Sequence, residues 1–249
     1  NETCAAISMV YLFERMFLLH GESKYIDCLE RSLYNGVISG MSMDGGRFFY
    51  PNPLSSDGKY KFNADGNTTR QPWFGCACCP SNLCRFIPSV PGYLYGVKDN
   101  NIYVNLFAGN TSTIKVNGKD VVLEETTEYP WNGDIKIAVK KSGVKNANLL
   151  VRIPGWVRNQ VVPSDLYKYS DAEKPAYSVT VNGKAVEADL NANKGYLPVK
   201  NIKKGDVIRI HFDMPIRTVV ANGKVADDKG KVAVERGPLV YCAEAVDNQ

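Results

Sequence analysis

The feature that most constrains the fold of this chain is a change in the spacing of its apolar residues near position 93. Between Ala6 and Phe17, apolar side chains recur at three- and four-residue steps, which is the period of an amphipathic α-helix. Later the period becomes two, because Ile102 and Val104 alternate with polar or aromatic residues. We therefore predict an α+β chain with a helical part over residues 1–92 and a β part over residues 93–249.

We expect the helical part to form a helical hairpin followed by a third helix. Gly21 is placed to end the first helix, since glycine readily adopts the left-handed conformation found at helix C-termini. A second helix is predicted from about Ser23 to Val37, and the short joint makes the pair antiparallel. A third helix begins near Pro80, which suits a first helical turn, and ends by Pro88 and Pro91.

In the β part, Asn-Gly dipeptides between strand-like residues predict tight hairpin turns. Short strands at regular spacing, without helices between them, predict an antiparallel β-sandwich. The strong turn candidates are Asn117-Gly118 and Asn182-Gly183, and Asn222-Gly223 is a weaker third.

Composition and charge exclude several classes of function. With 44% hydrophobic and 22% charged residues, the chain has the composition of a globular protein. Its net charge of +4 comes from scattered basic residues, so we expect no nucleic-acid partner. We expect no membrane partner either, because the longest apolar region, Ile7 to Leu19, is interrupted by Ser8, Glu14 and Arg15 and falls short of about 20 apolar residues.

The start of the chain indicates a piece of a larger protein. Asn1 is not a methionine, no signal segment follows it, and a helical pattern is under way by Thr3. We therefore expect an upstream part, in which any secretion signal would lie, and predict no compartment.

Four residues in two short segments predict a metal site. Glu2, Cys4, Cys78 and Cys79 together offer one carboxylate and three thiolates, the ligand types that zinc prefers in tetrahedral geometry. Glu2 and Cys4 are two residues apart, a spacing that a helix does not place on one face, so an irregular helix start or an entering loop is needed. The predicted cofactor is zinc.

Other uses of the cysteines stay open at this point. The zinc could be purely structural, although adjacent cysteines and a carboxylate ligand are unusual in structural sites. A disulfide between Cys78 and Cys79 would be strained, and Cys76 could instead pair with Cys84 or stay a thiol. A redox sensor without bound zinc is a further alternative.

Four motifs along most of the chain carry a resemblance to a known family. With them, the chain resembles glycoside hydrolase family 127, whose best-known activity is β-L-arabinofuranosidase. The motifs are Asn1-Glu2-Thr3-Cys4, Glu30-Arg31-Ser32-Leu33-Tyr34-Asn35-Gly36, Cys76-Ala77-Cys78-Cys79-Pro80-Ser81-Asn82 and Val234-Glu235-Arg236-Gly237-Pro238-Leu239-Val240-Tyr241.

The resemblance implies a fold and a mechanism. The fold is the last helices of an (α/α) barrel over residues 1–92, followed by a β-sandwich over residues 93–249. The same four residues would hold the zinc, and Cys78 would be the nucleophile that attacks the anomeric carbon. A thiolate is a strong nucleophile, and two successive displacements would retain the anomeric configuration.

The resemblance also assigns residues that contact the sugar. Glu30 matches a position that hydrogen-bonds substrate hydroxyls, although an exposed glutamate paired with Arg31 or Lys24 is the alternative. Tyr50 looks like a pocket-lining tyrosine, with core packing as its alternative. Trp73 and Phe74 could stack on a sugar ring, but packing is more common beside a metal loop.

The remaining catalytic groups are expected outside the chain. In the family, the general acid is a glutamate upstream of the Asn-Glu-x-Cys motif, and pocket histidines lie further upstream. Neither His20, expected to cap a helix or lie at the surface, nor His211, expected on a sheet face, matches those histidines. We therefore predict that the 249 residues alone lack turnover.

The function expected from this resemblance is that of a retaining, zinc-dependent glycosidase with a cysteine nucleophile. It would release terminal β-L-arabinofuranose or a related furanose from plant-type glycans. Its partners would be an oligosaccharide or glycan substrate and, in a homo-oligomer, further copies of itself. The alternative is a carbohydrate-binding or structural module with a structural zinc.

Overall fold

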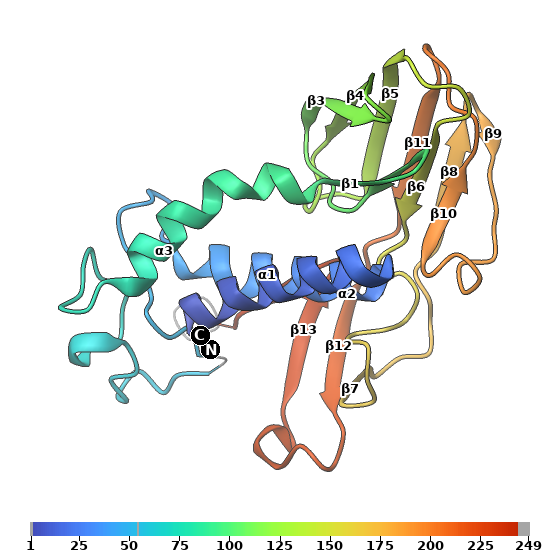
Figure 1. Ribbon diagram of the computed structural model, residues 1–249. Helices are drawn as coiled ribbons and strands as arrows, with labels where there is room; N and C mark the ends of the chain where they lie inside the picture. Colours follow the sequence, from blue (N-terminus) through green and yellow to red (C-terminus); the bar gives the residue numbers. More distant parts are fainter. Residues whose placement is uncertain (1, 54, 244–249) are drawn as a thin grey trace. The chain divides into compact units, whose positions relative to one another are not determined.

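A computed structural model describes residues 2–53 and 55–243 (Figure 1). Two compact units share the chain. The first comprises residues 1–20 and 28–93, and the second comprises residues 21–27 and 94–249. The predicted division of the chain between residues 92 and 93 differs from these units in residues 21–27 and in Tyr93.

The first unit is mainly helical. Ile7, Val10 and Phe17 form the buried line of α1, at the spacing expected of a helix that packs on one side. Gly21, with φ +63°, follows the last residue of that helix, as predicted. The helices are α1 Thr3–His20, α2 Ser23–Ser32 and α3 Cys78–Phe86, and the 3₁₀ turns of this unit are Ile38–Gly40, Ala64–Gly66 and Ile87–Tyr93.

The predicted second helix does continue to Val37, but its last turn is wider than an α-helix. Residues Leu33–Val37 form a π-helical turn, in which the N–H of Ile38 donates to the carbonyl of Leu33. Within this turn, a Cβ atom added to Gly36 would lie 2.9 Å from the Cβ of Ala6 in α1. Glycine therefore allows this turn to lie close against α1.

Among the described helices, α1 is long and apolar enough to cross a membrane. A core helix of a globular protein passes the same test of length and composition. The absence of a membrane partner stays a prediction.

The second unit consists of sheets. The strand orders are β1-β2-β6-β10, β3-β4-β5-β11-β8-β9 and β14-β13-β12-β7, so its described residues form three sheets. The strands are β1 Tyr95–Lys98, β2 Asn101–Val104, β3 Asn110–Val116, β4 Lys119–Thr127, β5 Asp134–Ser142, β6 Asn148–Arg152, β7 Tyr167–Tyr169, β8 Tyr177–Val181, β9 Lys184–Ala185, β10 Tyr196–Val199, β11 Val207–Phe212, β12 Ile216–Ala221, β13 Val232–Arg236 and β14 Leu239–Tyr241.

The pairing is antiparallel, as predicted, with one exception. Strands β2 and β6 run parallel, which local patterns did not indicate. Positive φ angles at Asn117 and Gly118, and at Asn182 and Gly183, confirm two of the predicted tight turns. The third is wrong, because Asn222-Gly223 opens a longer loop between β12 and β13, which pair side by side in Figure 1.

Aromatic rings fill part of the core of the second unit. Phe107 packs edge-on against Tyr129 at 5.4 Å between ring centroids and tilted against Phe212 at 5.6 Å. Trp156 meets Phe212 edge-on at 5.9 Å. Buried and exposed side chains alternate along strand β11, and Phe212 is one of the buried ones. His211 lies on a face of the sheet, as predicted, and that face is the exposed one.

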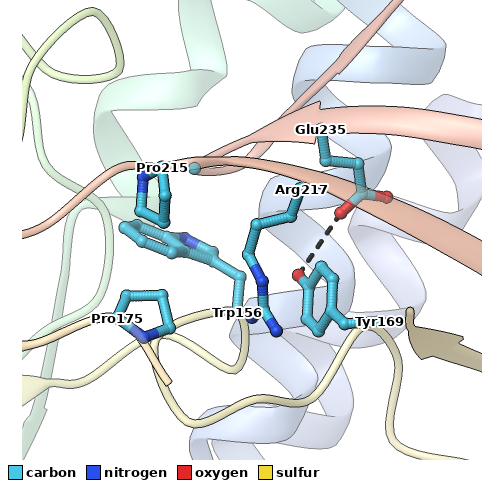
Figure 2. A pocket seen from close by; sticks show the side chains of 7 residues that line it. Trp156, Tyr169, Pro175, Pro215, Arg217 and Glu235 are labelled. Carbon is cyan, nitrogen blue, oxygen red and sulfur yellow. Dashed lines mark hydrogen bonds between the residues drawn. The ribbon is translucent and has the colours of Figure 1, made fainter. Parts of the chain in front are cut away.

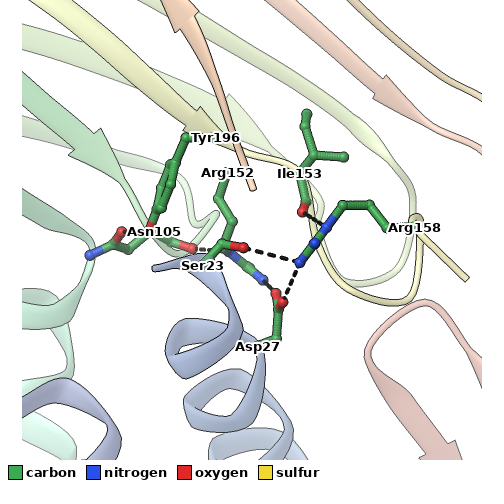
Figure 3. A network of polar contacts seen from close by, with 7 residues as sticks. All are labelled: Ser23, Asp27, Asn105, Arg152, Ile153, Arg158 and Tyr196. Atoms are coloured by element: carbon green, nitrogen blue, oxygen red, sulfur yellow. Dashed lines mark hydrogen bonds and ion pairs between the residues drawn. The ribbon is translucent and has the colours of Figure 1, made fainter. Parts of the chain in front are cut away.

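A buried ion-pair network holds residues 21–27 within the second unit (Figure 3). Arg152 is fully buried, and its Nη1 lies 2.7 Å from Oδ1 of Asp27. Arg158 donates to Oδ2 of Asp27 at 2.8 Å and to Oγ of Ser23 at 3.0 Å. The hydroxyl of Tyr196 donates to the side chain of Asn105 at 2.7 Å. These contacts fasten the first turn of α2 to the strands.

Candidate metal and thiolate site

Three segments of the first unit bring the predicted ligands together. Glu2 precedes α1 and forms an isolated antiparallel bridge with Pro51, and Cys4 lies in the first helical turn. Cys78 and Cys79 are the first two residues of α3. The irregular helix start that the spacing of Glu2 and Cys4 required is therefore present.

The four side chains form a compact donor set. One carboxylate oxygen and three sulfur atoms lie within 4.8 Å of one another. In a tetrahedral zinc site with a Zn–S bond of about 2.3 Å and a Zn–O bond of about 2.0–2.2 Å, the sulfur and the oxygen are about 3.5–3.7 Å apart. Sγ of Cys79 lies 3.7 Å from Oε1 of Glu2, which is close to that separation. The chemistry and spacing of these donors fit zinc.

Tyr50 connects the two halves of the cluster. Its backbone carbonyl accepts from the N–H of Thr3 at 3.0 Å, and its hydroxyl lies 2.9 Å from Sγ of Cys78. The ring of Phe74 meets the ring of Tyr50 edge-on at 5.8 Å. Tyr50 is half-buried and reaches the thiol directly, a contact that its predicted pocket-lining role did not include.

The hydrogen bond between Tyr50 and Cys78 shifts the pKa values of both side chains. It is the main cause that lowers the pKa of Cys78, because the phenolic O–H stabilises the thiolate by donating to it. The same bond is the main cause that raises the pKa of Tyr50, which holds its proton more tightly. Cys78 is therefore the thiol that this arrangement favours in its ionised form.

The other two thiols differ from Cys78. Burial is the main cause that raises the pKa of Cys4 and of Cys79. A hydrogen bond from Asn82 opposes the rise in the pKa of Cys4. Asn82 stands in the third quoted motif, but no role was predicted for it; its place in α3, one turn after Cys78, was the available signal.

The loop that leads to Cys78 is anchored at two points. Backbone hydrogen bonds of 2.8 and 2.9 Å join Phe48 and Gln71. Oδ2 of Asp65 accepts from the N–H of Gly75 at 3.0 Å. Between these points Phe74 is buried, whereas Trp73 is 63% exposed. Phe74 is therefore a packing residue, which was the alternative to a role in stacking on a sugar ring. Trp73 is not a packing residue.

Glu30 lies in the last turn of α2 and is only 2% exposed. Lys24, the proposed partner of an exposed Glu30, is instead 2.6 Å from Glu22. The alternative that Glu30 is an exposed surface glutamate is therefore wrong. The compact donor set does not include Glu30, and its role toward substrate stays a prediction.

No disulfide joins the seven cysteines, all of which lie within the described residues, so the predicted disulfide alternatives are not formed. Cys76 and Cys84 are both exposed. His211 lies between two carboxylates, 2.7 Å from Asp134 and 3.1 Å from Asp213, in the second unit.

Comparison with known protein families places the chain. Three models of one family match almost all of it: the β-L-arabinofuranosidase catalytic domain at residues 1–92, the middle domain at 101–214 and the C-terminal domain at 216–249. The chain belongs to glycoside hydrolase family 127.

Three relatives of the chain are named as arabinofuranosidases. A non-reducing end β-L-arabinofuranosidase of Bifidobacterium longum subsp. longum is 35% identical over the whole chain. A solved β-arabinofuranosidase of the family is 58% identical with a TM-score of 0.91, and a β-L-arabinofuranosidase from Geobacillus stearothermophilus is 38% identical with a TM-score of 0.84. Each of these two solved structures covers 99% of the chain.

The chain spans only part of these relatives. It covers 36% of the Bifidobacterium protein and 37% of each of the two solved chains.

Proposed function

We propose that this chain supplies the nucleophile and the metal ligands of a retaining glycosidase that releases terminal β-L-arabinofuranose or a related furanose from plant-type glycans. The observation that carries the proposal is the 2.9 Å contact between Cys78 and Tyr50 beside three further metal-ligand side chains. Family membership and the printed names of the relatives support the substrate class.

Glu2, Cys4, Cys78 and Cys79 would hold a zinc ion, since their donors lie within 4.8 Å of one another. Bound zinc would keep coordinated thiols deprotonated at neutral pH. This matters most for Cys4 and Cys79, because burial raises their pKa values.

Cys78 would act as the nucleophile. Its thiolate attacks the anomeric carbon, a C–S bond forms and the glycosidic C–O bond breaks, while a general acid protonates the leaving oxygen. Water, deprotonated by the same group, then displaces the sulfur and regenerates the thiolate. Two inversions leave the sugar with its original anomeric configuration.

Two further residues would assist. The thiol of Cys78 donates to the hydroxyl of Tyr50 at 2.9 Å. Once Cys78 is a thiolate, that hydroxyl would donate to the sulfur instead and hold it in one orientation when it attacks. Glu30 would accept hydrogen bonds from sugar hydroxyls, as its position in the second quoted motif implies by resemblance to the family.

The general acid is expected outside this chain, and the (α/α) barrel would be completed there as well. Helices α1, α2 and α3 would then be part of the catalytic barrel, with residues 93–249 as the sandwich. On this view, the 249 residues alone do not hydrolyse an aryl β-L-arabinofuranoside at the rate of a whole family protein. Hydrolysis at that rate would contradict this division of labour.

The test compares two cysteines of α3 in a full-length protein that contains this chain. Cys78→Ser should abolish hydrolysis and covalent labelling by a thiol-directed arabinofuranose analogue, detected by peptide mass spectrometry. Cys84→Ser is the matched control, because Cys84 is exposed on the same helix and lies outside the compact donor set. Labelling that survives in Cys78→Ser, or that moves to Cys76, would favour the carbohydrate-binding module with a structural zinc.

Metal content separates the zinc claim from the nucleophile claim. Cys79→Ser should lower the zinc bound per chain, measured by atomic emission after dialysis, and Cys84→Ser should leave it unchanged. Equal zinc in both variants would refute the assigned ligand set, whatever the activity of Cys78→Ser.

A further inference from the structure

A small cavity in the second unit is lined by part of the fourth motif quoted above, Val234 to Tyr241 (Figure 2). Its volume is about 10 Å³. That is roughly the space that one water molecule requires and far below the size of a sugar ring. The lining residues are Trp156, Tyr169, Pro175, Pro215, Arg217, Glu235 and Gly237.

Two N–H donors on this wall lack a protein partner. Trp156 is 7% exposed and Arg217 is 6% exposed. Within residues 2–53 and 55–243, neither Nε1 of Trp156 nor Nη1 of Arg217 has a hydrogen-bond partner. A buried donor left unsatisfied costs free energy, so a buried N–H without a protein partner calls for an explanation such as a bound water.

The other nitrogens of Arg217 are occupied. Nε lies 3.2 Å from Oδ1 of Asp171, and Nη2 donates to Asn159 at 2.7 Å and also contacts Asp171. The guanidinium stacks on the ring of Tyr169, with Cζ 3.5 Å from its centroid. Arg217 is therefore held by Asp171, Asn159 and Tyr169, and Nη1 is the one nitrogen of its guanidinium without a hydrogen-bond partner among the described residues.

The same wall offers an acceptor. Glu235 is buried in β13, and Oε2 of its carboxylate accepts from the hydroxyl of Tyr169 at 3.3 Å. A carboxylate has lone pairs for further donors. The cavity thus combines two donors and one acceptor.

We propose that the cavity binds one ordered water molecule, which accepts from Trp156 Nε1 and Arg217 Nη1 and donates to the carboxylate of Glu235. Three polar partners are typical of a buried water. A small anion would use the same two donors, but Glu235 would repel it, and the charge of Arg217 is already balanced by Asp171.

The hydration site gives the fourth motif a physical role. Glu235 supplies the acceptor, and Gly237, two residues later, has φ +58°. A Cβ atom at Gly237 would lie 2.2 Å from Cε of Met214, the flexible end of that side chain, and 3.7 Å from Cζ2 of Trp156 in the cavity wall. The positive φ favours glycine at this position, and Glu235 supplies the polar group.

The direct test is a high-resolution crystal structure of the full-length protein. We expect one density peak within hydrogen-bonding distance, about 2.7–3.2 Å, of both Nε1 of Trp156 and Nη1 of Arg217. After a bromide soak, the cavity should show no anomalous signal. Density absent from the cavity, or a bromide peak within it, would overturn the proposal.

A second test changes one atom of the indole. Site-specific replacement of Trp156 by 3-benzothienylalanine exchanges N–H for sulfur at nearly constant shape. If a water accepts from this N–H, the melting temperature should fall, because the water loses a partner. A rise would mean that the N–H was an unsatisfied donor, and would refute the site. The same replacement at the exposed Trp131 should leave the melting temperature unchanged.

Discussion

Burial of Glu125 should make the stability of the protein fall as the pH rises toward neutrality. Glu125 lies in β4 and is only 3% exposed. Its Oε2 accepts from the hydroxyl of Tyr95 at 3.0 Å, and its Oε1 accepts from the N–H of Ala108 at 3.2 Å. These bonds favour the ionised form, but burial outweighs them and raises the pKa of Glu125 to about 7.

The expected magnitude follows from linkage between protonation and folding. The unfolded chain releases this proton near the ordinary pKa of 4.5, whereas the folded protein keeps it until the pH reaches about 7. At 1.36 kcal/mol for each pH unit, the difference corresponds to about 3 kcal/mol. This contribution is fully present below pH 4.5, is lost progressively as the pH rises to about 7, and does not return above it.

Glu125→Gln removes the titration while it keeps the shape. The amide oxygen can accept from the N–H of Ala108, and the amide nitrogen can donate to the hydroxyl of Tyr95. That hydroxyl is then free to donate to Asn110, whose Oδ1 lies 3.4 Å away. The free energy of unfolding of the wild type should fall by about 3 kcal/mol more than that of the variant as the pH rises from 4.5 to 8.

The measurement is denaturant-induced unfolding of both proteins across this pH range. Glu124→Gln is the matched control, since Glu124 is the neighbouring residue on the other face of β4 and pairs with Lys140 at 3.0 Å in a more exposed position. A stability difference between Glu125→Gln and the wild type that does not change with pH would refute the reasoning.

Three other predictions concern the second unit. Asp27→Ala leaves the buried Arg152 without its carboxylate and should destabilise the protein by about 3–5 kcal/mol in denaturant unfolding; an unchanged midpoint would contradict the role of the network. The hydrogen bond to Asp134 raises the pKa of His211, so its stabilising effect is present below about pH 6.5 and is lost as the pH rises through the raised pKa. Asp134→Asn should lower the pKa of His211 in an NMR titration, and an unshifted curve would exclude the contact. Gly133→Ala places a Cβ atom 1.9 Å from the carbonyl oxygen of Phe212 and should cost about 3 kcal/mol, whereas Gly223→Ala, with no atom within 4 Å, should be neutral in the same thermal melts.

Local signals predicted the local structure well. Gly21 ends α1, and two Asn-Gly turns join the strands on either side, because each depends on backbone conformations that few other residues adopt. Asn222-Gly223 failed because a dipeptide does not determine the length of its loop. The parallel pairing of β2 and β6 joins segments 47 residues apart at Asn101 and Asn148, and neither strand carries a sign of it.

The site was predictable in its composition but not in its contacts. Ligand chemistry alone brought Glu2, Cys4, Cys78 and Cys79 together, and the structure places them in one cluster. The hydroxyl of Tyr50 on Cys78 depends on how the intervening loop folds, so spacing could not indicate it. Burial of Glu30 was likewise hidden, since basic neighbours in the sequence suggested a surface position.

The π-helical turn Leu33–Val37 makes the number of residues in this segment matter as much as their identity. A π turn accommodates one residue more than an α turn, as a helix does after a single insertion. Deleting one residue there would let the turn close as an α-helix and rotate the following chain by about 100°. Pro51, which bridges to Glu2, and Tyr50, which contacts Cys78, both lie downstream of this turn, whereas Glu2 and Cys4 lie upstream of it. Single-residue deletions between Leu33 and Val37 should therefore disrupt the cluster even though none of its ligands is touched.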